Sequence, residues 1–215
     1  MSVLINTQIQ VPIKQSIKLE TTIGIDFGIK TLATLSNGIV FENKHFFKKN
    51  ENKLKIEQRS LARKVKQSKN YIKQKLKVAL LHEKVRNQRT DYLHKISSYL
   101  VKNYDTIVLE DLSVKSMMQN RSLSKAINDV SWNELRTMIT YKCDWYGKNL
   151  KIIGRFEPSS KICSNCGNIK HDLTLKNRTY VCSKCGFELD RDLNASINIK
   201  TFGLRDQPLS AKVRH

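Results

Sequence analysis

The sequence has no long apolar run and is poor in acidic side chains. No stretch of about 18 apolar residues occurs, so we expect no helix that crosses a membrane. The first residues show no charged start followed by an apolar run, so we expect no secretory signal and a cytoplasmic location. Only 19 Asp and Glu oppose 39 Lys and Arg, which leaves a net charge of +20. A charge of this sign attracts polyanions and predicts a nucleic-acid partner.

Glycine and proline are absent between residues 48 and 102, a segment that is rich in helix formers. We predict two helices there, with a break near residues 68–70. Between Lys48 and Arg89, 15 basic residues oppose 3 acidic ones, so this segment holds +12 of the net charge. The charge could belong to a solvated helix face. Because residues 82–91 are polar nearly all round, a nucleic-acid backbone along the helix is the favoured interpretation.

Apolar segments elsewhere predict an α/β fold. Helices are expected at 131–147 and at 194–203, where Gly203 would stop the second one. In the first, Trp132, Leu135, Ile139, Cys143 and Tyr146 form one apolar stripe, which explains Cys143 as a core thiol. An Asn-Gly pair at 37–38 predicts a hairpin turn. Strands are expected at 21–26, 32–37, 39–43, 106–110 and 150–156.

Four cysteines form two matched pairs, and 15 residues separate one pair from the other. This spacing is typical of a zinc ribbon, in which four thiolates complete a tetrahedral shell around Zn²⁺. No coordination position stays open, so the predicted metal is structural. The glycine after each pair lets the backbone turn around the sulfurs. The predicted ligands are Cys163, Cys166, Cys182 and Cys185.

Three carboxylates stand at the ends of predicted elements. Asp26 ends one core strand, Glu110 ends another, and Asp192 begins the last helix. Because neighbouring strand ends converge in an α/β sheet, these acids could share one site and bind Mg²⁺ or Mn²⁺. Two such ions can promote phosphodiester cleavage. An acid after a strand can also be only a cap or turn residue, and we expect Asp111 and Asp190 not to be ligands.

Three segments together resemble the TnpB (OrfB-type) transposon-encoded proteins, which are RNA-guided DNA nucleases related to type V CRISPR effectors. The resemblance covers roughly residues 21 to 203, and the motifs occur in the order of the family. They are IGIDFGIK at 23–30, VLEDL at 108–112, and CSNCG followed by CSKCGFELDRDLNASINI within 163–199. Residues 82–95 and 131–147 also look like this family.

The resemblance implies a split RuvC-type nuclease with an RNase H-like fold. Asp26, Glu110 and Asp192 match the metal-binding acids of its three motifs, with Asp192 preferred to Asp190 because it stands two residues before Asn194. The cysteines match the zinc ribbon of the family, its TNB domain. The implied function is a Mg²⁺- or Mn²⁺-dependent DNA endonuclease that accompanies a transposable element, with DNA and a guide RNA as partners and a nucleoid-associated location in a prokaryote.

The same resemblance divides the chain into segments. Family members carry a recognition lobe and a wedge domain before the first motif, whereas about 20 residues precede it here. We therefore expect a truncated chain or a separately encoded N-terminal lobe as a partner. The alternative function is a non-cleaving nucleic-acid-binding zinc-ribbon protein. The expected segments are a wedge remnant (1–20), a first RuvC segment (21–45), a basic helical insertion (46–103), a second RuvC segment (104–157), the zinc ribbon (158–187), a third RuvC segment (188–203) and a basic tail (204–215).

Overall fold

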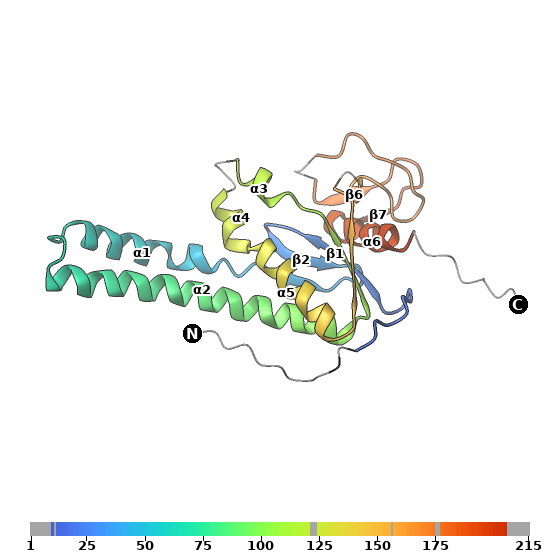
Figure 1. The fold of residues 1–215 in the computed structure, drawn as a ribbon. Coiled ribbons are helices and arrows are strands. Elements are labelled where there is room, and N and C mark those ends of the chain that lie inside the picture. Colours follow the sequence, from blue (N-terminus) through green and yellow to red (C-terminus); the bar gives the residue numbers. More distant parts are fainter. Residues whose placement is uncertain (1–9, 11, 121–123, 156, 175–176, 206–215) are drawn as a thin grey trace, which may run out of the picture.

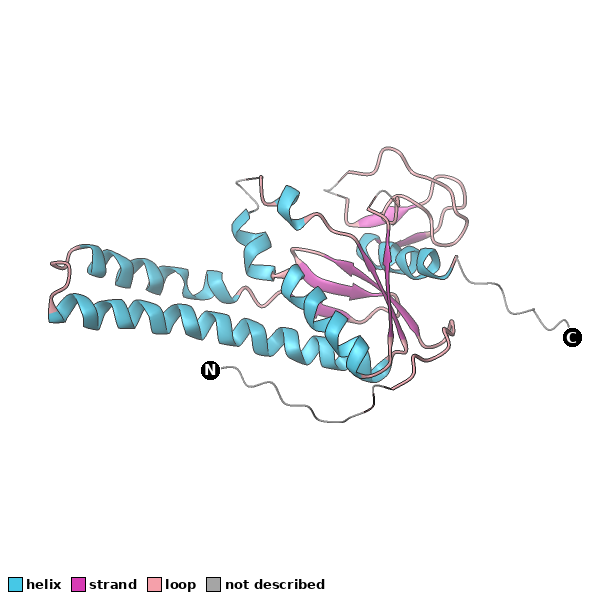
Figure 2. Cartoon of the chain, viewed as in Figure 1, coloured by secondary structure: helices cyan, strands magenta, loops and turns pink. Residues whose placement is uncertain are grey.

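The computed structural model describes residues 10, 12–120, 124–155, 157–174 and 177–205. A mixed sheet forms the centre, helices cover both of its faces, and a pair of helices projects from one side (Figure 1). Figure 2 shows the same arrangement by secondary structure. Half of the expected wedge remnant, residues 1–9 and 11, and most of the basic tail, residues 206–215, lie outside the described residues. Within the described residues, no helix is long and apolar enough to cross a membrane.

The sheet has five strands in the order β3-β2-β1-β4-β5. The first three strands along the chain are antiparallel, and β4 and β5 run parallel to β1. Gly38, with φ of 88°, makes the turn between β2 and β3 that the Asn-Gly pair predicts. The strands are β1 Thr22–Phe27, β2 Thr31–Leu35, β3 Val40–Glu42, β4 Thr106–Glu110 and β5 Asn149–Ile153.

The register of β1 on β4 determines which residues meet at the rim of the sheet. Ile25 lies opposite Leu109 in this parallel pair. One residue further along each strand, Asp26 therefore comes level with Glu110 on the neighbouring strand. Adjacent strands are about 4.8 Å apart, so the two carboxylates start from neighbouring backbone positions.

The larger core lies between the sheet and the helices α2 (Lys69–Asn103), α4 (Ser124–Val130) and α5 (Trp132–Trp145). Alternate residues of β1 and β4 point into it, as the two-residue period of a strand requires. Cys143 is buried there, as predicted, whereas Tyr146 is 49% exposed and the prediction of a buried Tyr146 was wrong. Tyr146 lies beyond the last turn of α5, where the helical period no longer turns its side chain inward.

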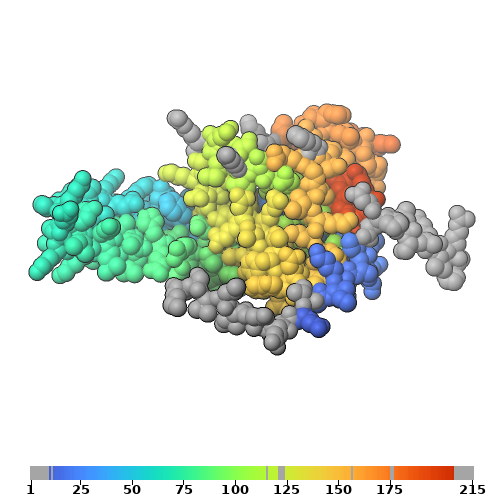
Figure 3. Space-filling model, viewed as in Figure 1, coloured from blue at the N-terminus to red at the C-terminus, as the bar shows by residue number. Residues whose placement is uncertain are grey.

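The projecting arm consists of α1 (Phe46–Ala62) and the first half of α2. The predicted break is confirmed, since Ser68 caps α2 by accepting a hydrogen bond from the backbone N–H of Tyr71 at 3.1 Å. Figure 3 shows the arm, coloured cyan to green, standing clear of the body. Most of the basic segment therefore lies on a surface that solvent reaches from several sides.

Helix α6 (Arg191–Leu204) covers the opposite face of the sheet. The prediction that this helix begins at residue 194 and stops at Gly203 was wrong. Asp190 caps the helix by accepting hydrogen bonds from the N–H groups of Asp192 and Leu193. Gly203 lies inside the helix, where a β-carbon would meet the side chain of Val108 at 2.4 Å. The glycine therefore permits packing and does not end the helix.

The remaining elements are short and were not predicted. A single turn, α3 (Val114–Met117), follows β4. Two short antiparallel strands, β6 (Thr179–Val181) and β7 (Glu188–Asp190), form a separate sheet in the cysteine segment. This small sheet lies beside α6 and carries its own cluster of buried side chains around Tyr180.

Candidate active site and metal centre

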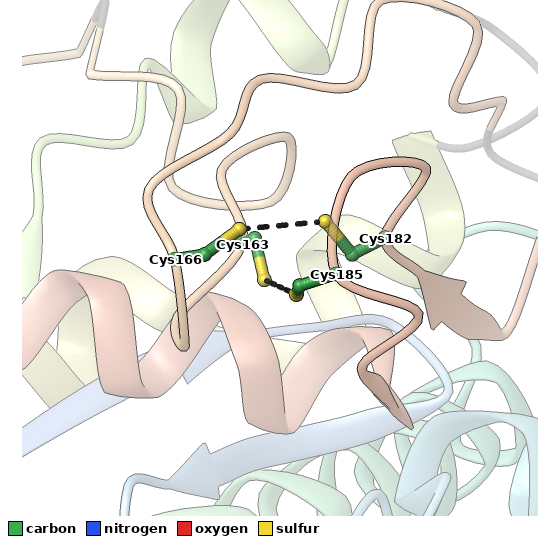
Figure 4. Close-up of side chains that lie close together, drawn as sticks. All are labelled: Cys163, Cys166, Cys182 and Cys185. Carbon is green, nitrogen blue, oxygen red and sulfur yellow. Dashed lines mark hydrogen bonds between the residues drawn. The ribbon is translucent and has the colours of Figure 1, made fainter.

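The four cysteines converge on one point, as Figure 4 shows. Their sulfurs all lie within 4.8 Å of one another; Sγ of Cys163 is 3.7 Å from that of Cys185, and Sγ of Cys166 is 3.6 Å from that of Cys182. A tetrahedral ion with sulfur ligands at about 2.3 Å would hold them about 3.8 Å apart. The donor set and its spacing therefore fit a structural metal ion.

Each cysteine pair turns through a glycine in the left-handed region, Gly167 with φ of 74° and Gly186 with φ of 69°. Backbone N–H groups of Cys185 and Lys184 lower the pKa of the Cys182 thiol to about 6. The N–H of Phe187 likewise lowers the pKa of Cys185. Both effects favour the thiolate, which is the form that binds a metal.

Two buried asparagines of α6 attach the first cysteine pair to the body. The side-chain amide of Asn194 donates to the carbonyl of Ile162 at 2.8 Å and accepts from the N–H of Ser164 at 3.0 Å. The amide of Asn198 donates to the carbonyls of Ser159 and Ile162, both at 2.7 Å. Sequence reasoning did not identify this contact. The available signal was a pair of amides four residues apart, on one face of the helix.

The structure brings the three predicted carboxylates to one cleft. Asp26, near the end of β1, Glu110, the last residue of β4, and Asp192, in the first turn of α6, all line a cavity of about 1070 Å³. The parallel register aligns the first two, and the packing of α6 on β1 brings the third beside them. Three acids from distant segments therefore share one rim of the sheet.

The electrostatics of the cleft disfavour three ionised carboxylates. Burial raises the pKa of Asp26 well above its ordinary value, and repulsion from Asp192 and Glu110 raises it further. Burial also raises the pKa of Glu110, although a hydrogen bond from the Ser159 hydroxyl at 3.4 Å opposes this shift. A divalent cation would relieve the repulsion, because it favours the charged form of every carboxylate around it.

The carboxylates share the cleft without forming a tight cluster. Among the described residues, only the cysteines bring three or more metal-binding atoms within 4.8 Å of one another. Asp192 also accepts a hydrogen bond from the Arg191 guanidinium at 3.1 Å. This ion pair offsets some of the negative charge, and metal binding would compete with it.

The two acids next to predicted ligands have structural partners. Asp111 binds the guanidinium groups of Arg136 and Arg155, each at 3.0 Å, and these contacts lower its pKa. Asp190 caps α6, as described above. Both therefore have a sufficient structural explanation.

Basic side chains surround the acids. Four exposed residues line the same cleft, one between β1 and β2 and three in the connection between β5 and β6, and sequence reasoning did not identify them. A phosphate backbone that approached the carboxylates would pass between these cations. They are Lys30, Arg155, Lys161 and Arg178.

Comparison with known proteins places this geometry in a family. The OrfB_IS605 family model, described as "Probable transposase", matches residues 5–121. A second model, "Cas12f1-like, TNB domain", matches residues 132–199, which include all four cysteines and Asp192. The two models together account for most of the chain.

Two curated relatives cover most of this chain. A "Putative RNA-guided DNA endonuclease" of Streptomyces pristinaespiralis is 43% identical over 182 residues, 85% of this chain and 45% of the relative. The "Putative RNA-guided DNA endonuclease InsQ" of Escherichia coli K12 is 34% identical over 217 residues, 94% of this chain and 53% of the relative. The chain thus spans about half the length of these relatives.

The fold is also similar to that of a solved structure. The Cas12f1 chain of a Cas12f1–sgRNA–target DNA complex, determined by cryo-EM, superposes with a TM-score of 0.60 at 21% identity, over 86% of this chain and 51% of that one. The mixed α/β fold is therefore one that Cas12f1 shares. Since a single family model covers more than half of its residues, this chain belongs to the OrfB_IS605 transposase family, the family of TnpB.

Proposed function

We propose that this chain is the RuvC-type, divalent-metal-dependent DNA endonuclease portion of a transposon-associated, RNA-guided nuclease. One observation carries the proposal: Asp26, Glu110 and Asp192 come from three distant segments and line one cleft. Burial, followed by repulsion from Asp192 and Glu110, raises the pKa of Asp26, and a bound cation would offset both effects.

The three carboxylates would hold the metal. Mg²⁺ or Mn²⁺ bound there would supply activation of a water and stabilisation of the leaving oxygen in phosphodiester cleavage. Asp26 and Glu110, level on adjacent strands, would ligate from the sheet, and Asp192 would complete the ligand set from α6. Ser159 would orient Glu110 through its hydroxyl. The basic side chains Lys30, Arg155, Lys161 and Arg178, which line the cleft, would hold the DNA strand in place.

The arrangement of the elements supports an RNase H-like fold. Three antiparallel strands are followed by two strands parallel to the first, and the acids lie on the first and fourth strands of the chain. The cysteine segment, with two knuckles and a small antiparallel sheet, has the form of a zinc ribbon. We assign Zn²⁺ to it because four thiolates in a closed shell suit that ion.

The proposed partners are a guide RNA and DNA. The curated relatives are named RNA-guided DNA endonucleases, and the Cas12f1 structure contains sgRNA and target DNA. The basic arm formed by α1 and α2 would contact the phosphate backbone of a heteroduplex by shape and charge. Such a protein would act at the nucleoid in the cytoplasm.

A nicking assay tests this proposal. We expect the purified chain to nick single-stranded DNA when Mg²⁺ is present, and Asp26→Ala to reduce the rate at least about 100-fold, because one metal ligand is lost. Asp91→Ala, which removes an exposed acid paired with Lys95, is the matched control and should cut at the wild-type rate. Equal activity of Asp26→Ala and wild type would contradict the proposal.

The second candidate is a nucleic-acid-binding zinc-ribbon protein that does not cleave. The observation that favours it is the spacing of the acids, because among the described residues only the cysteines bring three or more metal-binding atoms within 4.8 Å of one another. It predicts salt-sensitive binding of RNA or DNA with no Mg²⁺-dependent product. The same assay, run with a gel-shift measurement on the same substrate, separates the two functions.

A further inference from the structure

Helix α6 approaches the sheet very closely at Gly24, the third residue of β1. A β-carbon on Gly24 would lie 2.2 Å from the carbonyl oxygen of Ser196 and 2.5 Å from the backbone nitrogen of Lys200. Non-bonded heavy atoms normally rest about 3.5–4.0 Å apart, so no side chain fits at this position. Both obstacles are backbone atoms of α6, which cannot rotate out of the way. Figure 1 shows α6 lying against the sheet.

The close contact at Gly24 lies near two of the carboxylates, one on β1 and one on α6. Asp26 follows Gly24 by two residues on the same face of β1, a distance of about 6.6 Å. Asp192 precedes Ser196 by four residues on the same face of α6, a distance of about 6 Å. Asp26 and Asp192 both line the cleft, so the two acids lie on the same side of the contact. Asp26 and Asp192 therefore both extend from the part of the β1–α6 interface that Gly24 occupies.

Neither side of this contact can yield easily. The N–H of Gly24 donates to the Ser36 hydroxyl at 3.1 Å, and its carbonyl accepts from the N–H of Ser36 at 2.9 Å. These bonds hold the backbone of β1 at Gly24. On its far side, α6 is tied to the first cysteine pair through Asn194 and Asn198. A methyl group at position 24 would displace the helix, by roughly 1 Å if normal contact distances are restored.

We propose that Gly24 is a positioning residue for the metal site: its bare backbone lets α6 lie close enough for Asp192 to share a divalent ion with Asp26. The inference rests on the proposed nuclease function. Mg²⁺ requires oxygens at about 2.0–2.1 Å in near-octahedral geometry, so a shift of the helix cannot be absorbed by longer bonds.

A second glycine of the same interface provides a matched control. At Gly203, a β-carbon would lie 2.4 Å from a methyl group of Val108. Gly203→Ala therefore also disturbs the packing of α6 on the sheet, but about 16 Å along the helix from Asp192. At Gly154, a β-carbon would meet nothing within 4 Å, so Gly154→Ala provides the baseline. If Gly24 had a merely structural role, Gly24→Ala and Gly203→Ala would have the same effects on Mn²⁺ affinity and kcat.

The experiment measures Mn²⁺ binding to the zinc-loaded full chain by electron paramagnetic resonance, together with melting temperature and Mg²⁺-dependent nicking. We expect Gly24→Ala to weaken the Asp26-dependent Mn²⁺ site at least tenfold. It should lower kcat about 100-fold, as misplacement by about 1 Å can, while KM for DNA stays unchanged. Gly203→Ala should lower the melting temperature but keep both Mn²⁺ affinity and kcat.

Rescue adds a result that a structural role would not produce. In the Gly24→Ala background, Asp192→Glu lengthens the side chain by about 1.5 Å and should partly restore the Mn²⁺ affinity. In the wild-type background the same substitution should weaken binding. If Gly24→Ala does not fold, Asp26→Glu and Asp192→Glu alone measure the spacing, and unchanged Mn²⁺ affinity in both would overturn the inference.

Two outcomes separate this inference from the proposed function. Equal Mn²⁺ affinity and kcat in wild type and folded Gly24→Ala would refute the positioning role and leave the nuclease function intact. If wild-type protein shows no Mn²⁺ binding that Asp26→Ala abolishes, both the nuclease function and the role of Gly24 fail. The comparison of wild type with Asp26→Ala therefore tests the nuclease function separately, without any glycine variant.

Discussion

At the scale of single residues, adjacent carboxylates behave in opposite ways. Burial raises the pKa of Glu110, whereas Arg136 and Arg155 lower that of Asp111. The two acids are neighbours in sequence, but only Glu110 lies at the end of β4 and faces the cleft. Two guanidinium partners give Asp111 a structural role. The raised pKa values of Glu110 and Asp26 mean that ionising either carboxyl in the folded chain costs free energy.

This cost has a measurable consequence at Asp26. We expect zinc-loaded Asp26→Asn, without Mg²⁺, to melt about 3 °C or more above wild type at pH 7. With a raised pKa, the folded chain binds the proton more tightly than the unfolded chain does. Wild-type stability is therefore lost as pH rises through the raised pKa, and the asparagine escapes this loss. The measurement is thermal unfolding between pH 4 and pH 8.

The pH dependence provides the check on this prediction. The advantage of Asp26→Asn should shrink as pH falls toward the ordinary Asp pKa of 3.8, below which the carboxyl is protonated in both the folded and the unfolded state. Asp91→Asn, at an exposed ion pair, should match wild type at every pH. If Asp26→Asn melted below wild type at pH 7, the prediction would be wrong: the contacts of Asp26 would then stabilise the fold more than its ionisation destabilises it.

At the scale of elements, α6 joins the two candidate sites. One face of the helix packs on β1 at Gly24, its first turn carries Asp192, and Asn194 and Asn198 bind the segment before and within the first cysteine pair. Ser159, in the same segment, donates to Glu110. Removal of a metal ion bound by the four cysteines would therefore loosen contacts that reach two of the three carboxylates.

The asparagine contact can be tested without touching the cysteines. We expect Asn194→Ala to keep one zinc per chain, because the four thiolates remain. It should lose about 1–3 kcal/mol of unfolding free energy, since the N–H of Ser164 loses its partner and the carbonyl of Ile162 keeps only Asn198. Zinc content by mass spectrometry and denaturant unfolding measure the two quantities. Asn87→Ala, at an exposed site on α2, should cost less than about 0.5 kcal/mol. Loss of zinc from Asn194→Ala would contradict the expectation.

At the scale of the whole molecule, charge is distributed unevenly. The arm carries most of the excess positive charge, yet its outer surface is not purely polar: Ile72, Leu76 and Leu80, at successive turns of α2, are 59%, 59% and 53% exposed. Lysines flank this apolar stripe. The body holds the cleft and the cysteine site, so a nucleic acid bound to both would extend from the arm to the carboxylates.

The salt dependence of binding should report the role of the arm. We expect the triple replacement of Lys73, Lys75 and Lys77 by Gln to reduce the slope of log K against log salt for single-stranded nucleic acid by about 2, because each phosphate contact contributes about 0.7. Fluorescence anisotropy over a range of salt concentrations provides the slope. The same replacement of Lys18, Lys95 and Lys102, on the body, is the control. Equal slopes for both triples would argue against the arm as a phosphate-binding surface.

The sequence alone predicted those features that depend on local pattern. The convergence of the four cysteines followed from their spacing, because two matched short knuckles are typical of one shared metal site. The strands around Asp26 and Glu110 followed from apolar runs, and the break before α2 from Ser68, which caps the helix through its own side chain. Each of these signals stands in one continuous stretch of sequence, the longest of which is the cysteine segment.

Tertiary structure decided what depends on partners distant in the chain. Asp129 accepts from the N–H of Phe47 at 3.0 Å and so holds the first turn of α1, although 82 residues separate the two. Gly203 looked like a helix stop because the packing of Val108 against it is invisible in sequence. Likewise, the meeting of three acids at one cleft required both a strand register and the close approach of α6 at Gly24. Burial and repulsion arise only when the chain brings such residues together, and for that reason their pKa shifts could not be predicted from sequence.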